Sequence, residues 1–120
     1  MGSSIKLNNN MYWDLSSIYG ADVYNGIFVI PSGGTVTLNF TSSSQARGFL
    51  VTVPNGLEKS GFGIYGFGSN VSGAAIRDIV AASSLTINNS TAFQPKLVST
   101  NAYSIYCLWF ARAPLDYTIT

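Results

Sequence analysis

The chain has 120 residues, 9% of them charged, and a formal net charge of +1 at pH 7. This length predicts a single domain that can bury a core of its own. The few charges form no basic cluster, which argues against nucleic-acid binding, and no apolar run approaches the roughly 18 residues of a membrane-spanning helix.

The residue types that most often carry catalysis or bind metals are scarce. The sequence contains no histidine, which is the commonest general base and metal ligand. Its one cysteine, Cys107, lies in an apolar run and is expected to be a small buried hydrophobe. The five acidic residues are widely scattered, which does not favour paired-carboxylate catalysis. We therefore predict a protein that is not an enzyme and that uses no metal and no cofactor.

The first twenty residues have the weakest pattern. The start, MGSSIKLNNN, has neither a charged region nor an apolar stretch, so no signal peptide is predicted. We assign residues 1–4 to an N-terminal tail or cloning remnant and residues 5–120 to a single β-sandwich domain. Within residues 11–20 the helical and strand spacings compete, and we expect an irregular segment or a short turn of helix.

Short segments with strand patterns follow. TVTLNFT, at residues 35–41, places Val36, Leu38 and Phe40 on one face and polar side chains on the other, which predicts a strand with one wet face. The turn residues PSGG, at 31–34, precede it. Further strands are predicted at residues 26–30, 46–53, 85–87, 96–99 and 115–120, whereas residues 74–80 could form a strand or one helical turn.

The stretch GFGIYGFG, at residues 61–68, contains the spacing of a dinucleotide-binding fingerprint at Gly61, Gly63 and Gly66. That fingerprint requires a helix to open at the third glycine, but the following residues include further glycines, serines and an asparagine that disfavour a helix. The apolar phase also slips between Ile64 and Tyr65, as at a β-bulge. We therefore predict a bulged strand here, not a phosphate-binding turn.

The segment at residues 102–110 gives the strongest strand pattern, and both of its faces are largely apolar. One face can meet an opposite sheet, while the other needs a loop or another subunit to cover it. Seven to nine short strands in total predict an all-β, single-domain antiparallel β-sandwich or jelly roll. The residues predicted to form an oligomer interface are Tyr106, Leu108, Phe110, Phe62 and Phe67.

Aromatic and polar side chains cluster early in the chain. Aromatic rings stack on sugar C–H surfaces, and Asp or Asn side chains can bind two hydroxyl groups. The chain is also rich in uncharged polar residues, which suits hydrogen bonding to uncharged ligands such as sugars. The alternative is that these rings fill the core or a subunit interface. The candidate carbohydrate site comprises Tyr12, Trp13, Asp14, Tyr19, Asp22, Tyr24 and Asn25.

Four segments carry a resemblance to a known group of proteins: TVTLNFTSSS at 35–44, RGFLVTV at 47–53, SLTINNS at 84–90 and YSIYCLWF at 103–110. Their order resembles that of the C-terminal head domains of bacteriophage tail-fibre and receptor-binding proteins, over residues 26–112. The resemblance lies in strands and turns, and it assigns no individual site residue.

That resemblance implies a homotrimeric β-sandwich at the tip of a virion tail fibre, acting outside the host cell. It would recognise a host cell-surface glycan or teichoic acid. Two alternatives stay open: a monomeric bacterial carbohydrate-binding or adhesion module, and a purely structural virion component. The oligomeric mass is the observation that best separates them.

Overall fold

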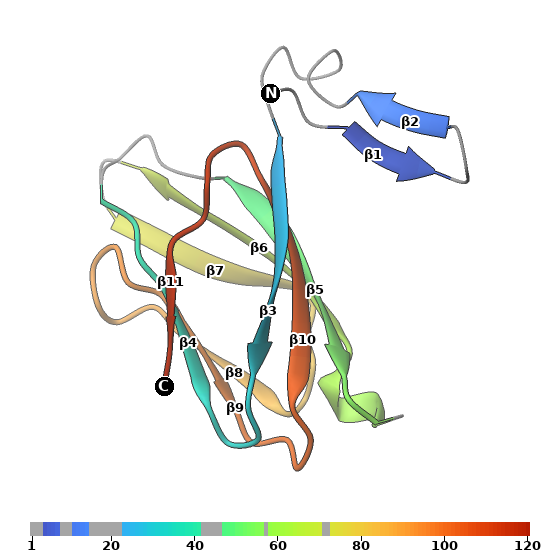
Figure 1. The fold of residues 1–120 in the computed structure, drawn as a ribbon. Helices are drawn as coiled ribbons and strands as arrows, with labels where there is room; N and C mark the ends of the chain where they lie inside the picture. Colours follow the sequence, from blue (N-terminus) through green and yellow to red (C-terminus); the bar gives the residue numbers. More distant parts are fainter. Residues whose placement is uncertain (1–3, 8–10, 15–22, 42–46, 57, 71–72) are drawn as a thin grey trace.

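We analysed a computed structural model of the chain, which describes residues 4–7, 11–14, 23–41, 47–56, 58–70 and 73–120. Nine strands in these residues form two antiparallel sheets that pack face to face (Figure 1). The order is β3-β10-β5-β6-β7 in the five-stranded sheet and β11-β4-β9-β8 in the four-stranded sheet. The predicted all-β antiparallel sandwich is therefore confirmed.

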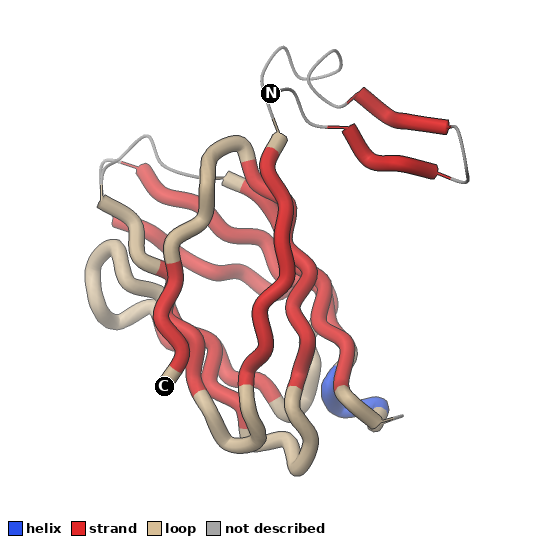
Figure 2. The backbone as a smooth tube through the Cα atoms, in the orientation of Figure 1, coloured by secondary structure: helices blue, strands red, loops and turns tan. Residues whose placement is uncertain are grey.

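Strands connected by turns and loops make up almost all of the described chain, as Figure 2 shows. The single-turn 3-10 helix η1 (Lys59–Gly61) belongs to the segment of chain that connects two neighbouring strands of the larger sheet. The strands are β1 (Ser4–Leu7), β2 (Met11–Asp14), β3 (Tyr24–Ile30), β4 (Thr35–Leu38), β5 (Gly48–Pro54), β6 (Gly63–Asn70), β7 (Gly73–Val80), β8 (Leu85–Asn88), β9 (Lys96–Ser99), β10 (Ile105–Ala111) and β11 (Tyr117–Ile119).

Two strands form near the N-terminus, where an irregular segment or a helical turn was expected. Met11–Asp14 pairs antiparallel with Ser4–Leu7, so that expectation is wrong for residues 11–14. Residues 15–20 lie outside the described part of the chain. The aromatic pair Tyr12-Trp13 favours a strand once a partner is present, and residues 4–7 supply that partner. Ser4, assigned to the tail, belongs to β1.

The alternation predicted for residues 35–41 is confirmed. Val36, Leu38 and Phe40 point into the core, and the first two are completely buried. The strand begins after a tight turn, in which the Gly34 N–H donates to the Pro31 carbonyl at 2.8 Å. Gly33 takes a φ of 70°, which a glycine adopts readily at this turn position.

The pairing of β6 with β7 is bulged at the predicted place, but the extra residue, Ile79, lies on β7, so the prediction of a bulge in β6 itself is wrong. The pairing with β7 shifts between Ile64 and Tyr65, so Ile64 lies opposite Val80 and Tyr65 lies opposite Asp78. The strand continues through Gly66 to Asn70, and no helix opens there. The glycine spacing therefore belongs to a strand and not to a dinucleotide-binding turn. Its neighbour Gly73–Val80 is a strand, which settles the alternatives left open for residues 74–80.

A buried polar cluster lies between the connecting segments at one end of the sandwich. The Asn101 side-chain amide donates to Ser84 Oγ at 2.9 Å and to Ser60 Oγ at 3.2 Å. The side-chain oxygen of Asn101 accepts from the Tyr103 N–H at 2.8 Å. Ser84 Oγ donates to the Ser60 backbone carbonyl at 2.7 Å. Because these polar groups satisfy one another, their burial avoids the cost of unpaired donors and acceptors.

Asn89 directly follows β8 of the four-stranded sheet and bonds to the middle of β7 in the five-stranded sheet. Its side-chain oxygen accepts from the Ile76 N–H at 2.9 Å, and its side-chain nitrogen donates to the Ile76 carbonyl at 3.0 Å. Ile76 lies on β7, which is the edge strand of the larger sheet. The amide of one side chain therefore satisfies both backbone groups of an edge residue, as a neighbouring strand would.

Candidate functional site

The outer faces of the two sheets differ in chemistry. On the four-stranded sheet the outward positions are mostly hydroxyl and amide side chains, with one lysine and one valine. Such a face is suited to contact with water. It includes polar residues of the strand that the alternation at residues 35–41 predicted to have one wet face. Its outward residues are Thr35, Thr37, Thr86, Asn88, Lys96, Val98 and Thr118.

Much of the outer face of the five-stranded sheet is apolar. One row of aliphatic side chains crosses all five strands in register, from β3 through β10, β5 and β6 to β7. The end residues are the most open, with Ile27 62% exposed and Val80 53% exposed. The row consists of Ile27, Leu108, Val51, Ile64 and Val80.

A second row lies beside the first on β3, β10 and β5, and it consists of Val29, Tyr106 and Val53. Phe62, which directly precedes β6, is 42% exposed. We refer to both rows together with Phe62 as the apolar face. Contiguous exposed apolar surface is uncommon on soluble monomers and marks sites of interaction.

The predicted interface residues divide between this surface and the core. Tyr106 and Leu108 lie on the apolar face, and Phe110 lies at its border, where its ring stacks on Phe49 with centroids 5.1 Å apart. Phe67 is buried, and its ring lies 6.3 Å from that of Phe40. The assignment of Phe67 to an interface is therefore wrong. The pairing of β6 with β5 runs without a break and places Phe67 on the same inward face as Tyr65.

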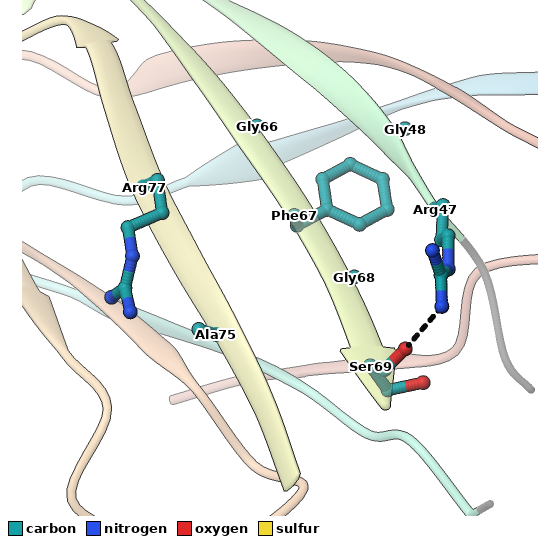
Figure 3. Close-up of a pocket in the computed structure, with 8 residues that line it drawn as sticks. All are labelled: Arg47, Gly48, Gly66, Phe67, Gly68, Ser69, Ala75 and Arg77. Atoms are coloured by element: carbon teal, nitrogen blue, oxygen red, sulfur yellow. Dashed lines mark hydrogen bonds between the residues drawn. The ribbon is translucent and has the colours of Figure 1, made fainter. Parts of the chain in front are cut away.

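A shallow groove adjoins the apolar face on strands β5, β6 and β7. Its volume is about 520 Å³, and Figure 3 shows Arg47 and Arg77 on opposite sides of β6. The Arg47 guanidinium donates to the Ser69 carbonyl at 3.3 Å. We refer to this hollow as the arginine groove, and it is lined by Arg47, Gly48, Gly66, Phe67, Gly68, Ser69, Ala75 and Arg77.

Glycines let the strands around the groove approach closely. A Cβ on Gly48 would lie 1.8 Å from the Phe110 carbonyl oxygen, so only glycine fits between β5 and β10 there. A Cβ on Gly66 would meet nothing closer than 3.8 Å, so Gly66 leaves the floor of the groove open. The glycine-rich sequence of this region serves close packing at one position and an open surface at the other.

The candidate carbohydrate site is described only in part. Tyr12, Trp13 and Asp14 lie on β2, while Tyr19 and Asp22 fall outside the described residues. Tyr24 and Asn25 begin β3 with exposed side chains, and Asn25 lies in register with Phe110 at the border of the apolar face. Whether the seven side chains gather into one site stays a prediction.

Neither the apolar face nor the arginine groove was predicted from the sequence. Ile27, Val29, Val51 and Val53 were recognised as strand residues, but their joint exposure depends on which strands pair. The available signal was the fully apolar run at residues 26–30, which resembles the one predicted to need cover at 102–110. The arginine groove had no signal, because its two arginines lie 30 positions apart in the chain.

The described residues contain no cluster of three or more acidic or cysteine side chains able to hold a metal ion. In the same part of the chain, no helix is long and apolar enough to cross a membrane. Cys107 is buried in the core as predicted, and burial raises the pKa of its thiol from 9.0 to about 12. A thiol held in its protonated form is a poor nucleophile.

Comparison of the chain with models of known protein families, with curated proteins and with solved structures found no match in any of the three. The geometry of the apolar face and of the arginine groove therefore carries the functional argument.

Proposed function

We propose that the chain is the head domain of a bacteriophage tail fibre, which assembles as a homotrimer and recognises carbohydrate on the host cell surface. The apolar face is the observation that carries this proposal, because it leaves side chains such as Ile27 and Val80 open to water in a single chain. The polar outer face of the other sheet supplies the contrast. The outer face of the four-stranded sheet is suited to contact with water, whereas the apolar face is suited to contact with a partner.

A symmetric assembly of identical chains accounts for this contrast. Cyclic assembly brings the same surface of every copy toward a shared axis, so each apolar face is covered at once. Five strands at about 4.8 Å spacing make the face about 20 Å wide. Its size supports contact with a folded partner, since the aliphatic row spans the full width of the sheet.

The mass of the purified protein tests the assembly. Light scattering at micromolar concentration should give three times 12.8 kDa, or about 38 kDa. A monomer at these concentrations would overturn the trimer. A monomer that still binds glycans would instead support a bacterial carbohydrate-binding or adhesion module. A stable oligomer that binds neither glycans nor cells would support a purely structural virion component.

Carbohydrate recognition is tested separately at Trp13, the largest aromatic side chain of the candidate carbohydrate site. Replacing it with alanine should abolish binding to host cells and leave the mass and the melting temperature nearly unchanged, because sugar stacking needs the ring face. Tyr103→Ala is the matched control, since Tyr103 is an exposed aromatic residue outside the candidate carbohydrate site. If Trp13→Ala dissociates or unfolds the protein, the ring is structural and the site lies elsewhere.

A further inference from the structure

The arginine groove lies where the apolar face ends. One register row runs from Phe110 on β10 through Phe49 and Gly66 to Arg77 on β7. Aromatic rings therefore lie at one end of the row and a cation at the other, with bare backbone between them. An aliphatic row lies on one side of it, and Arg47 and Gly68 lie on the other side, within the groove.

The groove is positively charged. Arg47 and Arg77 both line it, and no acidic side chain is among its lining residues in the described part of the chain. Asp78 follows Arg77 on β7, but it pairs in register with the inward-pointing Tyr65 and so projects from the other side of the strand. Arginine stays charged across the working pH range and presents a planar fork that matches carboxylate and phosphate groups.

Arg47 is held in place at the rim. Its guanidinium donates to the Ser69 carbonyl at the end of β6, as Figure 3 shows. This bond uses one of the five N–H donors of the group. An arginine that is already positioned loses less side-chain freedom when it binds an anion, which favours binding.

The rest of the groove suits the ring of a sugar. Gly66 and Gly68 carry no side chains, so a ligand can approach the backbone of β6, beside the Ile79 Cδ1 atom that lies 3.8 Å from the Cβ position of Gly66. Phe49 is 42% exposed beside Gly66, its partner on the neighbouring strand. An aromatic ring at that position offers a flat apolar surface to the C–H face of a pyranose ring or to the methylene groups of a polyol.

We propose that the arginine groove binds an acidic saccharide or polyol phosphate, with Arg47 on one side of β6 and Arg77 on the other as contacts for its carboxylate or phosphate groups, and with its carbon skeleton over Gly66 beside Phe49. This inference rests on the proposed carbohydrate recognition and names the chemistry of the ligand. None of the residues that line the groove belongs to the candidate carbohydrate site that begins at Tyr12.

The test measures binding of three probes to the intact protein by isothermal titration calorimetry. The probes are a uronic-acid trisaccharide, its uncharged methyl ester and a glycerol-phosphate trimer. At least one acidic probe should bind, its affinity should fall as salt is raised, and the methyl ester should bind at least tenfold more weakly than the uronate if the uronate is the ligand. Preference between the two acidic probes identifies the source of the anion.

Variants connect the binding to the groove. Arg77→Gln should weaken the acidic probe at least tenfold, because it removes a charge-assisted hydrogen bond. Lys59→Gln is the matched control, since it removes the same charge from an exposed residue of η1, outside the groove. Gly66→Ala places a methyl group on the floor without a clash, so it should weaken the probe while the melting temperature holds.

Several outcomes would overturn the inference: no binding of either acidic probe at millimolar concentration, equal binding of the methyl ester, or an equal loss in Lys59→Gln, which would indicate diffuse charge attraction. Host-cell binding separates this inference from the proposed function. Suppose that the unmodified protein binds cells and that Arg77→Gln binds both the acidic probes and the cells equally well. The groove is then not the binding site, and the proposed function still stands. If the unmodified protein binds no cells and no glycans, the recognition function itself fails.

Discussion

Replacing Ile27 with threonine removes apolar surface from the most open end of the aliphatic row. The side chain is 62% exposed in a single chain, and threonine keeps the β-branched shape that strands favour. The fold of the isolated chain should therefore lose less than about 0.5 kcal/mol. The effect of the substitution is expected in the assembly and not in the folding of each subunit.

The size of the assembly effect follows from the exposed fraction. Full burial of an isoleucine side chain contributes about 1.5–3 kcal/mol. Since 62% of Ile27 is still open, covering it in an interface contributes about 1–2 kcal/mol per copy, or about 3–6 kcal/mol for a trimer. Threonine retains one methyl group, so we expect a loss near the lower end, about a hundredfold in the trimer association constant.

Sedimentation velocity over a range of concentrations measures this shift, and circular dichroism melts the same samples. Val98→Thr is the control, because it changes a β-branched apolar residue on the outer face of the other sheet. The trimer should dissociate at higher concentration in Ile27→Thr and not in Val98→Thr. An unchanged trimer in Ile27→Thr would refute the assignment of the apolar face to subunit contact.

Three further predictions concern the fold. Asn101→Ala should lower the free energy of unfolding in urea by about 2–3 kcal/mol, because it leaves buried polar groups unpaired, while the exposed Asn88→Ala should cost less than about 1 kcal/mol. Gly48→Ala should destabilise the protein by about 3 kcal/mol, because its Cβ would meet a β10 carbonyl; a melting temperature like that of Gly66→Ala would contradict this packing. Burial raises the pKa of the Cys107 thiol to about 12 in the folded protein, so the thiol of the unfolded chain loses its proton at a lower pH. Stability should therefore fall as pH rises from about 9 toward 12, and Cys107→Ala should show a smaller fall across this range.

The sequence predicted local structure well where one strand carried its own pattern. The alternation through Val36, Leu38 and Phe40 identified both faces of a strand, and the change of face after Ile64 marked the step at which the pairing with β7 is bulged. In both places the side-chain period of two directly reports which face is buried. A glycine spacing that resembled a nucleotide site was also rejected correctly, because no helix could follow it.

What depended on pairing between distant strands could not be predicted. The apolar face exists because β10 lies between β3 and β5, and a single sequence does not state that order. Phe67 was misplaced for a related reason: its apolar neighbours made both phases of β6 plausible, and the pairing of β6 with β5 and β7 directs its ring inward. Residues 11–14 formed a strand because a partner, β1, was available.

The Asn89 amide has a consequence for how copies of the chain can join. By pairing with the backbone of Ile76, it occupies the hydrogen-bonding positions that an incoming strand from another chain would need at this edge. Sheet extension through the middle of β7 is therefore blocked by one side chain. Open-ended growth into fibrils is suppressed at this edge, while closed assembly through the broad surface of the sheet stays available.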